Sequence, residues 1–219
     1  GQHAGFTSDF AKAADYYTRA LSLDPRNPVL MERALTAQIS LGHFDRAGPI
    51  LTRIDGIGLS SPLANIVKLT QWVKAGDYQA VAKAYEGNFT VGGLLDGLIK
   101  PWIAVGEGRV SDAVAGFDAL AEEPGLGNIA YYHKALALAS AGDYDGAEAI
   151  LSGEAHGPIT VSARGLKAEI EILSQMDRAE DALTKLDQVF GATPPPVFDS
   201  MAQRLRGGEI LPFDLVTSA

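Results

Sequence analysis

The chain contains no cysteine, has fewer basic than acidic residues, and lacks any long apolar run. The absence of cysteine excludes a disulfide framework, a thiolate metal site and a cysteine nucleophile. With 18 Lys and Arg against 27 Asp and Glu, the formal net charge is −9, which argues against a nucleic-acid partner because such proteins need a basic footprint. No run of 18 or more apolar residues is present, so no membrane-spanning helix is predicted.

Residue patterns that carry chemistry are also missing. The four histidines (His3, His43, His133 and His156) lie in separate segments, and none has a histidine partner at i+4. There is no HExxH motif and no cluster of metal-ligand residues. Residues 106–108, Gly-Glu-Gly, do not form a phosphate loop, since no strand is predicted before them and no lysine follows at the required distance. The sequence therefore predicts a non-enzymatic protein with no catalytic residues, no metal and no cofactor.

What the chain does contain is a helical pattern, seen first between Phe10 and Pro28. Its apolar residues recur at steps of three and four, so that they share one face of a helix. They are Phe10, Ala13, Ala14, Tyr17, Ala20 and Leu21. The helix should end at Asp24, because the residue before a proline is disfavoured in helical geometry. Pro28 suits the first turn of a second helix, and an antiparallel helix pair is predicted.

The same pattern recurs along the chain: an aromatic or apolar residue, a small residue three further on, and a large apolar residue four beyond that. The six sets are Phe10/Ala13/Tyr17, Phe44/Ala47/Leu51, Tyr78/Val81/Tyr85, Val110/Ala113/Phe117, Tyr144/Ala147/Leu151 and Ala179/Ala182/Leu186. Subtracting the numbers of their first members gives separations of 34, 34, 32, 34 and 35 residues. In four cases a glycine stands two residues earlier, namely Gly42, Gly76, Gly108 and Gly142. A period near 34 built from helix–turn–helix units is typical of tetratricopeptide repeats (TPR), and residues 1 to about 190 resemble that family.

This resemblance implies an all-α fold, namely a TPR-type α-solenoid of antiparallel helix pairs, with about six repeats forming a right-handed superhelical arc. The small residue of each set would lie where the two helices of a repeat cross. We expect a single solenoid over residues 1–219, divided into a partial repeat 1–27, repeats at about 28–61, 62–93, 94–127, 128–161 and 162–193, an extra helix 197–206 and a tail 207–219. Since the chain begins inside a repeat and ends on an apolar stretch, we also expect it to be a fragment of a longer protein.

The resemblance also places the binding surface. In this family the first helix of each repeat lines a concave groove, through positions 2, 5, 9 and 12 of the repeat. The candidate groove residues are Leu63, Ile66 and Thr70 of the third repeat, Leu95, Leu98 and Trp102 of the fourth, and Ile129 and Tyr132 of the fifth. Such an apolar groove suits an amphipathic helix or an extended peptide. Alternatively these residues pack internally, because Lys68, Lys100 and Lys134 occupy a normally apolar position and leave a rotated register open.

The predicted function is therefore a scaffold or adaptor that binds a protein or peptide partner in the groove. The alternative is a carrier that holds a small apolar ligand, such as a lipid or acyl chain, in the same groove. Several stretches, among them FAKAADYYTRALSLDPRNP and GEILPFDLVTSA, are also similar to exported TPR proteins of alphaproteobacteria. That resemblance implies a periplasmic location, with a cytoplasmic one as the alternative.

Overall fold

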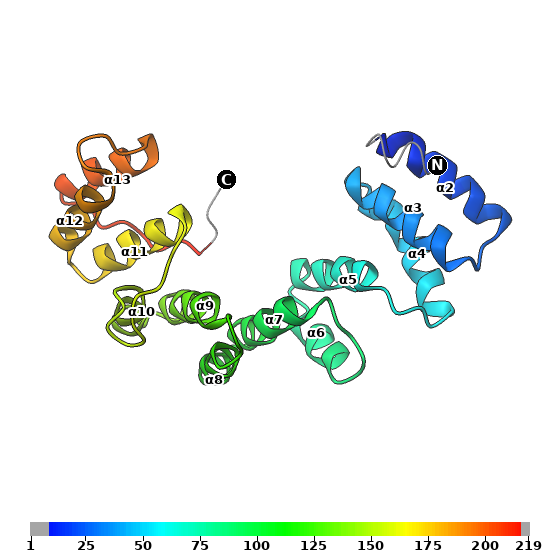
Figure 1. Cartoon of the computed structure of the whole chain (residues 1–219), viewed down its shortest axis with the longest axis horizontal. Coiled ribbons are helices and arrows are strands. Elements are labelled where there is room, and N and C mark those ends of the chain that lie inside the picture. Colours follow the sequence, from blue (N-terminus) through cyan, green and yellow to red (C-terminus); the bar gives the residue numbers. More distant parts are fainter. Residues whose placement is uncertain (1–8, 216–219) are drawn as a thin grey trace. The chain divides into compact units, whose positions relative to one another are not determined.

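The protein is all-helical in the computed structural model, which describes residues 9–215 (Figure 1). Within that range there are twelve α-helices and no strand, which confirms the predicted all-α class. The helices are α2 (Phe10–Leu23), α3 (Pro28–Ser40), α4 (Phe44–Gly56), α5 (Pro62–Lys74), α6 (Tyr78–Tyr85), α7 (Gly93–Gly106), α8 (Val110–Ala121), α9 (Gly127–Ser140), α10 (Tyr144–Leu151), α11 (Ala163–Gln175), α12 (Ala179–Phe190) and α13 (Pro196–Arg206). The opening of the partial repeat, His3 and the last four residues of the tail lie outside the described residues.

The helices form two compact units, one ending at Gly93 and the other beginning at Leu94. In the first unit α2 packs on α3, α3 packs on both α4 and α5, and α5 packs on α6. In the second unit each helix from α8 to α12 packs on the next one along the chain. Within each unit, most of these contacts thus join helices that are consecutive in the chain. None of the described helices is both long enough and apolar enough to cross a membrane.

Each of the six repeated residue sets begins at the first residue of a helix. These helices are α2, α4, α6, α8, α10 and α12. The small residue of each set is fully enclosed: Ala13 is 2% exposed, and Ala47, Val81, Ala113, Ala147 and Ala182 are all 0% exposed. Full burial is what is expected of these positions if they lie at helix crossings, where a short side chain lets two helices approach closely.

The turns before α4, α6, α8, α10 and α12 share one hydrogen-bond pattern. A backbone N–H donates to the carbonyl five residues earlier, over 2.8–3.0 Å, as in the Schellman helix ending. The donor and acceptor pairs are His43 and Gln38, Asp77 and Trp72, Arg109 and Ala104, Asp143 and Leu138, and Arg178 and Leu173. Glycine with a positive φ precedes the donor in the first four turns, and Asp177, with φ 58°, does so in the fifth. Aspartate tolerates this left-handed conformation better than most residues, so the fifth turn keeps its geometry without glycine.

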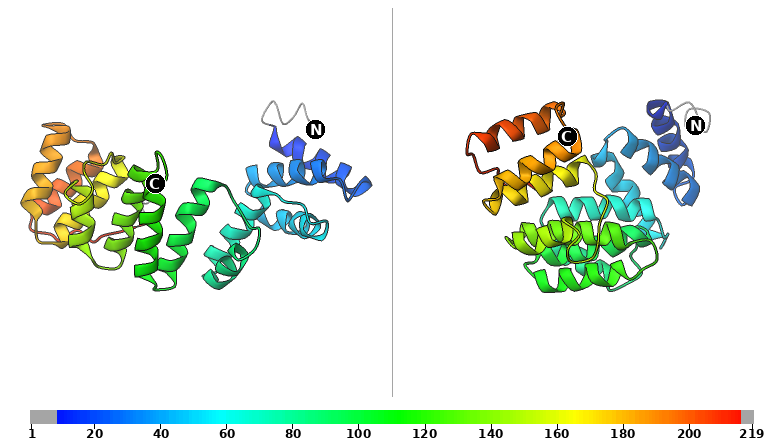
Figure 2. Two further views of the ribbon diagram at one scale, coloured as in Figure 1. Left: turned by 60° about the horizontal axis from the view of Figure 1, so that its bottom comes forward. Right: turned by 60° about the vertical axis from the view of Figure 1, so that its left-hand side comes forward.

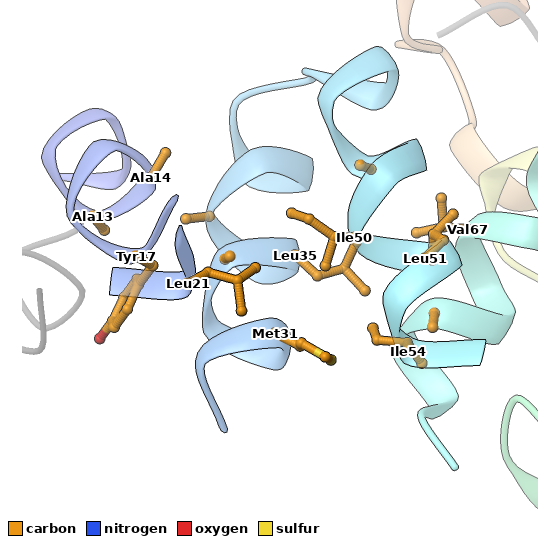
Figure 3. Close-up of a cluster of buried hydrophobic side chains, with 14 residues drawn as sticks. Ala13, Ala14, Tyr17, Leu21, Met31, Leu35, Ile50, Leu51, Ile54 and Val67 are labelled. Carbon is orange, nitrogen blue, oxygen red and sulfur yellow. The ribbon is translucent and has the colours of Figure 1, made fainter. Parts of the chain in front are cut away.

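The core of the first unit joins α2, α3, α4 and the start of α5 (Figure 3). Its centre is formed by Met31 and Leu35 of α3, both 0% exposed, and Ile54 of α4, 1% exposed. Figure 3 also shows Leu21 of α2 and Val67 of α5 in this cluster. Of the six residues predicted to form the apolar face of α2, four are buried, namely Ala13, Ala14, Tyr17 and Leu21.

In the second unit, glycines let α7 and α8 approach closely. A Cβ at Gly97 would lie 2.7 Å from Cδ1 of Leu120, and one at Gly116 would lie 2.8 Å from Cγ of Pro101. The proline ring thus occupies the space that a side chain at Gly116 would need. Pro101 lies inside α7, which continues past it to Gly106.

Candidate peptide-binding surface

The predicted groove residues differ in how far they are exposed. Ile66, at 38%, and Leu95, at 44%, are open to solvent, as is Thr70. Leu98 is only 8% exposed and belongs to the core of the second unit. The half-buried members are Leu63, Trp102, Ile129 and Tyr132. Part of the set is thus available for a partner and part contributes to internal packing.

Trp102 is held by an aromatic cluster inside the second unit. Its indole Nε1–H donates a hydrogen bond to Nδ1 of His133 on α9, over 3.0 Å. The ring of Phe117 on α8 meets the indole edge to face, with centroids 5.8 Å apart. His133 in turn stacks on Phe117 at an interplanar angle of 18°. Trp102 therefore ties α7 to α8 and α9, and replacing it would disturb packing as well as any binding surface.

The hydrogen bond from Trp102 defines the protonation state of His133. An indole N–H can only donate, so Nδ1 of His133 must be unprotonated. Burial among aromatic rings lowers the pKa of His133 from its ordinary value of 6.5, because the charged imidazolium is poorly solvated there. The native state thus holds this histidine neutral under conditions in which the unfolded chain begins to protonate it.

We predict that His133 makes the protein less stable in mild acid. The unfolded chain takes up a proton at this residue as the pH falls through about 6.5, while the native state, with its lowered pKa, does not. The free energy of unfolding should therefore decrease from pH 7.5 to pH 5.5. Urea titrations at both pH values would measure the effect, and His133→Gln should show a smaller decrease than wild type. An equal decrease in wild type and in His133→Gln would contradict the prediction.

Two lysines at the normally apolar position form interhelical ion pairs. Lys68 on α5 pairs with Asp55 on α4, and Nζ of Lys134 on α9 lies 2.7 Å from Oδ1 of Asp118 on α8. Their side chains are only 19% and 12% exposed, so the alkyl stems are covered while the ammonium groups reach a carboxylate. At both positions the lysine is thus accommodated by an ion pair with a carboxylate of the preceding helix.

A further surface is found where the chain turns back after α13. Residues 209–214, which we call the tail segment, run past α11 (Figures 1 and 2). Ser174 Oγ accepts a hydrogen bond from the Leu211 N–H over 2.8 Å, and Gln175 Nε2 donates one to the Leu211 carbonyl over 2.6 Å. Glu171 Oε2 accepts a longer bond, 3.4 Å, from the Asp214 N–H. On the tail side all three contacts are made by backbone groups.

Side chains of the tail segment add apolar contacts. Leu211 is 2% exposed and belongs to the cluster formed by α11, α12 and α13. The ring of Phe213 lies edge to face with Tyr144 of α10, at a centroid distance of 6.3 Å. Because this segment covers α11, even polar residues of that helix are enclosed, and Glu171 and Ser174 are 6% and 3% exposed. The tail segment is therefore docked by both backbone and side-chain contacts.

The docking residues of α11 stand in the register of the predicted groove. Gly142 follows α9 in the same way as Asp177 follows α11, and their numbers differ by 35. Residues 136 and 139 of α9 are positions 9 and 12 of the fifth repeat, and adding 35 to them gives 171 and 174. Positions 9 and 12 of the family pattern are thus occupied by Glu171 and Ser174. The sequence analysis assigned no groove residues to this helix. Extending the register by one repeat would have found them, although the tail segment that contacts them carries no recognisable motif.

Together the described residues define a class: an all-helical protein of consecutively packed helices in which one helix face holds an extended segment. No group of three or more His, Asp or Glu side chains that could bind a metal occurs among residues 9–215. A scan against protein-family models finds no match for the chain, and a search of curated proteins finds none either.

Proposed function

We propose that this chain is a non-enzymatic, TPR-type solenoid of about six helix pairs that binds extended segments of partner proteins along the exposed faces of its first helices. The observation that carries the proposal is the docking of the tail segment on α11. The resemblance to exported repeat proteins extends the proposal to a periplasmic location. On this view the tail segment shows the kind of ligand that these faces accept.

The geometry on α11 favours recognition of an extended backbone. Ser174 and Gln175 contact both the N–H and the C=O of one residue, Leu211. Every peptide presents these groups, so such contacts supply affinity for many sequences. The buried side chain of Leu211 and the ring of Phe213 against Tyr144 supply selectivity. A partner peptide with a leucine followed two residues later by an aromatic residue would reproduce both.

Other first helices expose apolar side chains in the same register. Val29 on α3 is 62% exposed, Ile66 and Val73 on α5 are 38% and 42% exposed, and Leu95 on α7 is 44% exposed. All four stand at position 2, 5 or 12 of the predicted repeats. Large apolar side chains left open at equivalent positions are typical of an interaction surface, and they support a binding face on α3 and α5 of the first unit and another on α7 of the second.

The proposal is tested with a labelled peptide that copies the tail. We would measure fluorescence anisotropy of EILPFDLV with the full chain and with its Leu211→Asp variant. Wild type should bind weakly, because its own tail competes at an effective concentration in the millimolar range. Leu211→Asp should bind at least about tenfold more tightly, because a buried charge displaces the tail. A peptide methylated on the backbone nitrogen of its first leucine, which corresponds to Leu211, should bind poorly, since it lacks the N–H donated to Ser174.

A matched pair of variants locates the contact. In the Leu211→Asp background, Gln175→Ala should weaken binding, because Gln175 donates to the backbone of the tail. Gln203→Ala should not, since Gln203 on α13 is exposed and bonds Asp199 of its own helix. Equal binding of the methylated and unmethylated peptides, or no binding to Leu211→Asp, would contradict the proposal. A stoichiometric lipid from an organic extract that also displaces the labelled peptide from Leu211→Asp would instead favour the carrier alternative, which uses the same groove.

A further inference from the structure

The first unit contains a hollow that the peptide-binding proposal does not use. It measures about 590 Å³ and lies between α2 and α4, with the C-terminal end of α3 and the turn after it also lining it. None of its lining residues is a predicted groove residue. The lining consists of Ala11, Ala14, Asp15, Thr18, Leu21, Ser22, Gln38, Leu41, His43, Arg46, Pro49, Ile50 and Arg53. A volume in the range of about 300–1,000 Å³ is typical of small-molecule sites.

The walls of this hollow are mainly apolar. Ala14 and Leu21 on α2 are 4% and 3% exposed, and Ile50 on α4 is 7% exposed (Figure 3). Leu41 and Pro49 continue the apolar lining. Pro49 lies inside α4, and its ring adds carbon surface on the side that faces the hollow. A ligand would therefore bury hydrocarbon between α2 and α4.

Apart from two arginines, the polar side chains that line the hollow already have partners within the chain. The amide of Gln38, which is 4% exposed, bonds the Thr18 hydroxyl over 3.3 Å and the His43 ring over 3.2 Å. Asp15, the one carboxylate in the lining, is 3.0 Å from the guanidinium of Arg19. The hollow thus offers neither a free carboxylate nor an unpaired buried amide to a ligand.

Two arginines differ from these paired groups. Arg46 and Arg53 both line the hollow and are seven residues apart on α4, so they lie on the same side of the helix two turns apart. Both side chains are exposed, and neither guanidinium forms an ion pair with any residue from 9 to 215, although the chain as a whole carries a net charge of −9. Guanidinium groups favour planar anions such as carboxylates through paired hydrogen bonds.

We propose that this hollow binds an anionic amphiphile, a small molecule with a carboxylate head and an unbranched apolar tail, such as a medium-chain fatty acid. The head is held by Arg46 and Arg53, and the tail lies against Ala14, Leu21 and Ile50. This site differs from the peptide-binding surface, because its lining lies mainly on α2 and α4, the second helices of the predicted pairs, and includes no predicted groove residue.

Isothermal titration calorimetry with the full chain tests the proposal, using octanoate, octan-1-ol and acetate as probes. Octanoate should bind at one site per chain. Octan-1-ol, which keeps the apolar tail but lacks the charge, should bind with an affinity at least about tenfold lower than that of octanoate. Acetate, which keeps the charge but lacks the tail, should give no measurable binding. Equal affinity for octanoate and octan-1-ol, or no binding of octanoate, would overturn the proposal.

Variants with matched changes in charge locate the site. Arg46→Gln with Arg53→Gln should weaken octanoate binding about tenfold or more. Arg26→Gln with Arg33→Gln removes the same charge from exposed positions of the first unit that do not line the hollow, and should leave binding unchanged. Ala11→Phe should block the hollow without loss of thermal stability, because Ala11 is exposed. Equal loss of binding in the two double variants would overturn the site, since it would reflect general electrostatics.

Discussion

Replacing Phe117 with alanine is expected to lower the free energy of unfolding by about 3–5 kcal/mol, the range for truncating a buried aromatic side chain. Phe117 is 0% exposed and contacts both the indole of Trp102 and the ring of His133. Its removal leaves a cavity in the core of the second unit and takes away the ring on which His133 stacks. Because Trp102 is part of this cluster, its fluorescence reports the unfolding of the region that is altered.

The measurement is denaturant unfolding followed by tryptophan fluorescence in a Trp72→Phe background, so that only Trp102 emits. Leu95→Ala is the control, since Leu95 lies on α7 in the same unit, is 44% exposed and should cost much less. Equal losses in the two variants would contradict the prediction, because a buried and a half-exposed apolar side chain would then contribute alike. Repeat proteins can unfold in several steps, so each transition should be fitted separately.

The second large effect is expected from Ala113→Trp on α8. Ala113 is 0% exposed and lies in the cluster where α8 packs on α9. An indole there must push the two helices apart or leave its preferred rotamer, at a cost of at least about 1–3 kcal/mol. For a chain of this size, each kcal/mol lowers the melting temperature by roughly 2–4 °C. Thermal unfolding followed by circular dichroism measures the shift.

Two further variants make this test specific. Ala115→Trp places the same side chain on the same helix at an exposed position, and should leave the melting temperature nearly unchanged. Ala147→Trp on α10 repeats the change at another small residue of the pattern, again 0% exposed, and should behave like Ala113→Trp. Unchanged unfolding in both buried variants would show that the small residues of the pattern do not lie at helix crossings.

Much of the helical framework could be predicted because its signals are local. The repeated residue sets coincide with the starts of α2, α4, α6, α8, α10 and α12. The glycine before each of four turns has the positive φ that the helix ending requires. The turn at Asp177 escaped the glycine pattern, yet it makes the same hydrogen bond from Arg178 to Leu173. Asp177 thus has the positive φ of the four turn glycines, although it is a different residue type.

The candidate binding residues were harder to predict, because their exposure depends on what packs over them. Leu98 and Ile66 both occupy position 5 of their predicted repeats, yet Leu98 is 8% exposed and Ile66 38%. Trp102 is a predicted groove residue, but its indole N–H donates to His133, which lies 31 positions further along the chain. Such a contact has no counterpart in the local pattern of either helix.

The sequence by itself determined the helices, their turns and their buried faces, since periodicity and turn residues act over a few neighbouring positions. Only the tertiary structure decided which surfaces are occupied and which remain open. Ser174 meets Leu211 across 37 positions of the chain, through a side chain and a backbone group that could pair with many others. Likewise, Arg46 and Arg53 can be recognised as candidate ligand contacts only because α2 lies opposite α4 and a hollow remains between the two helices.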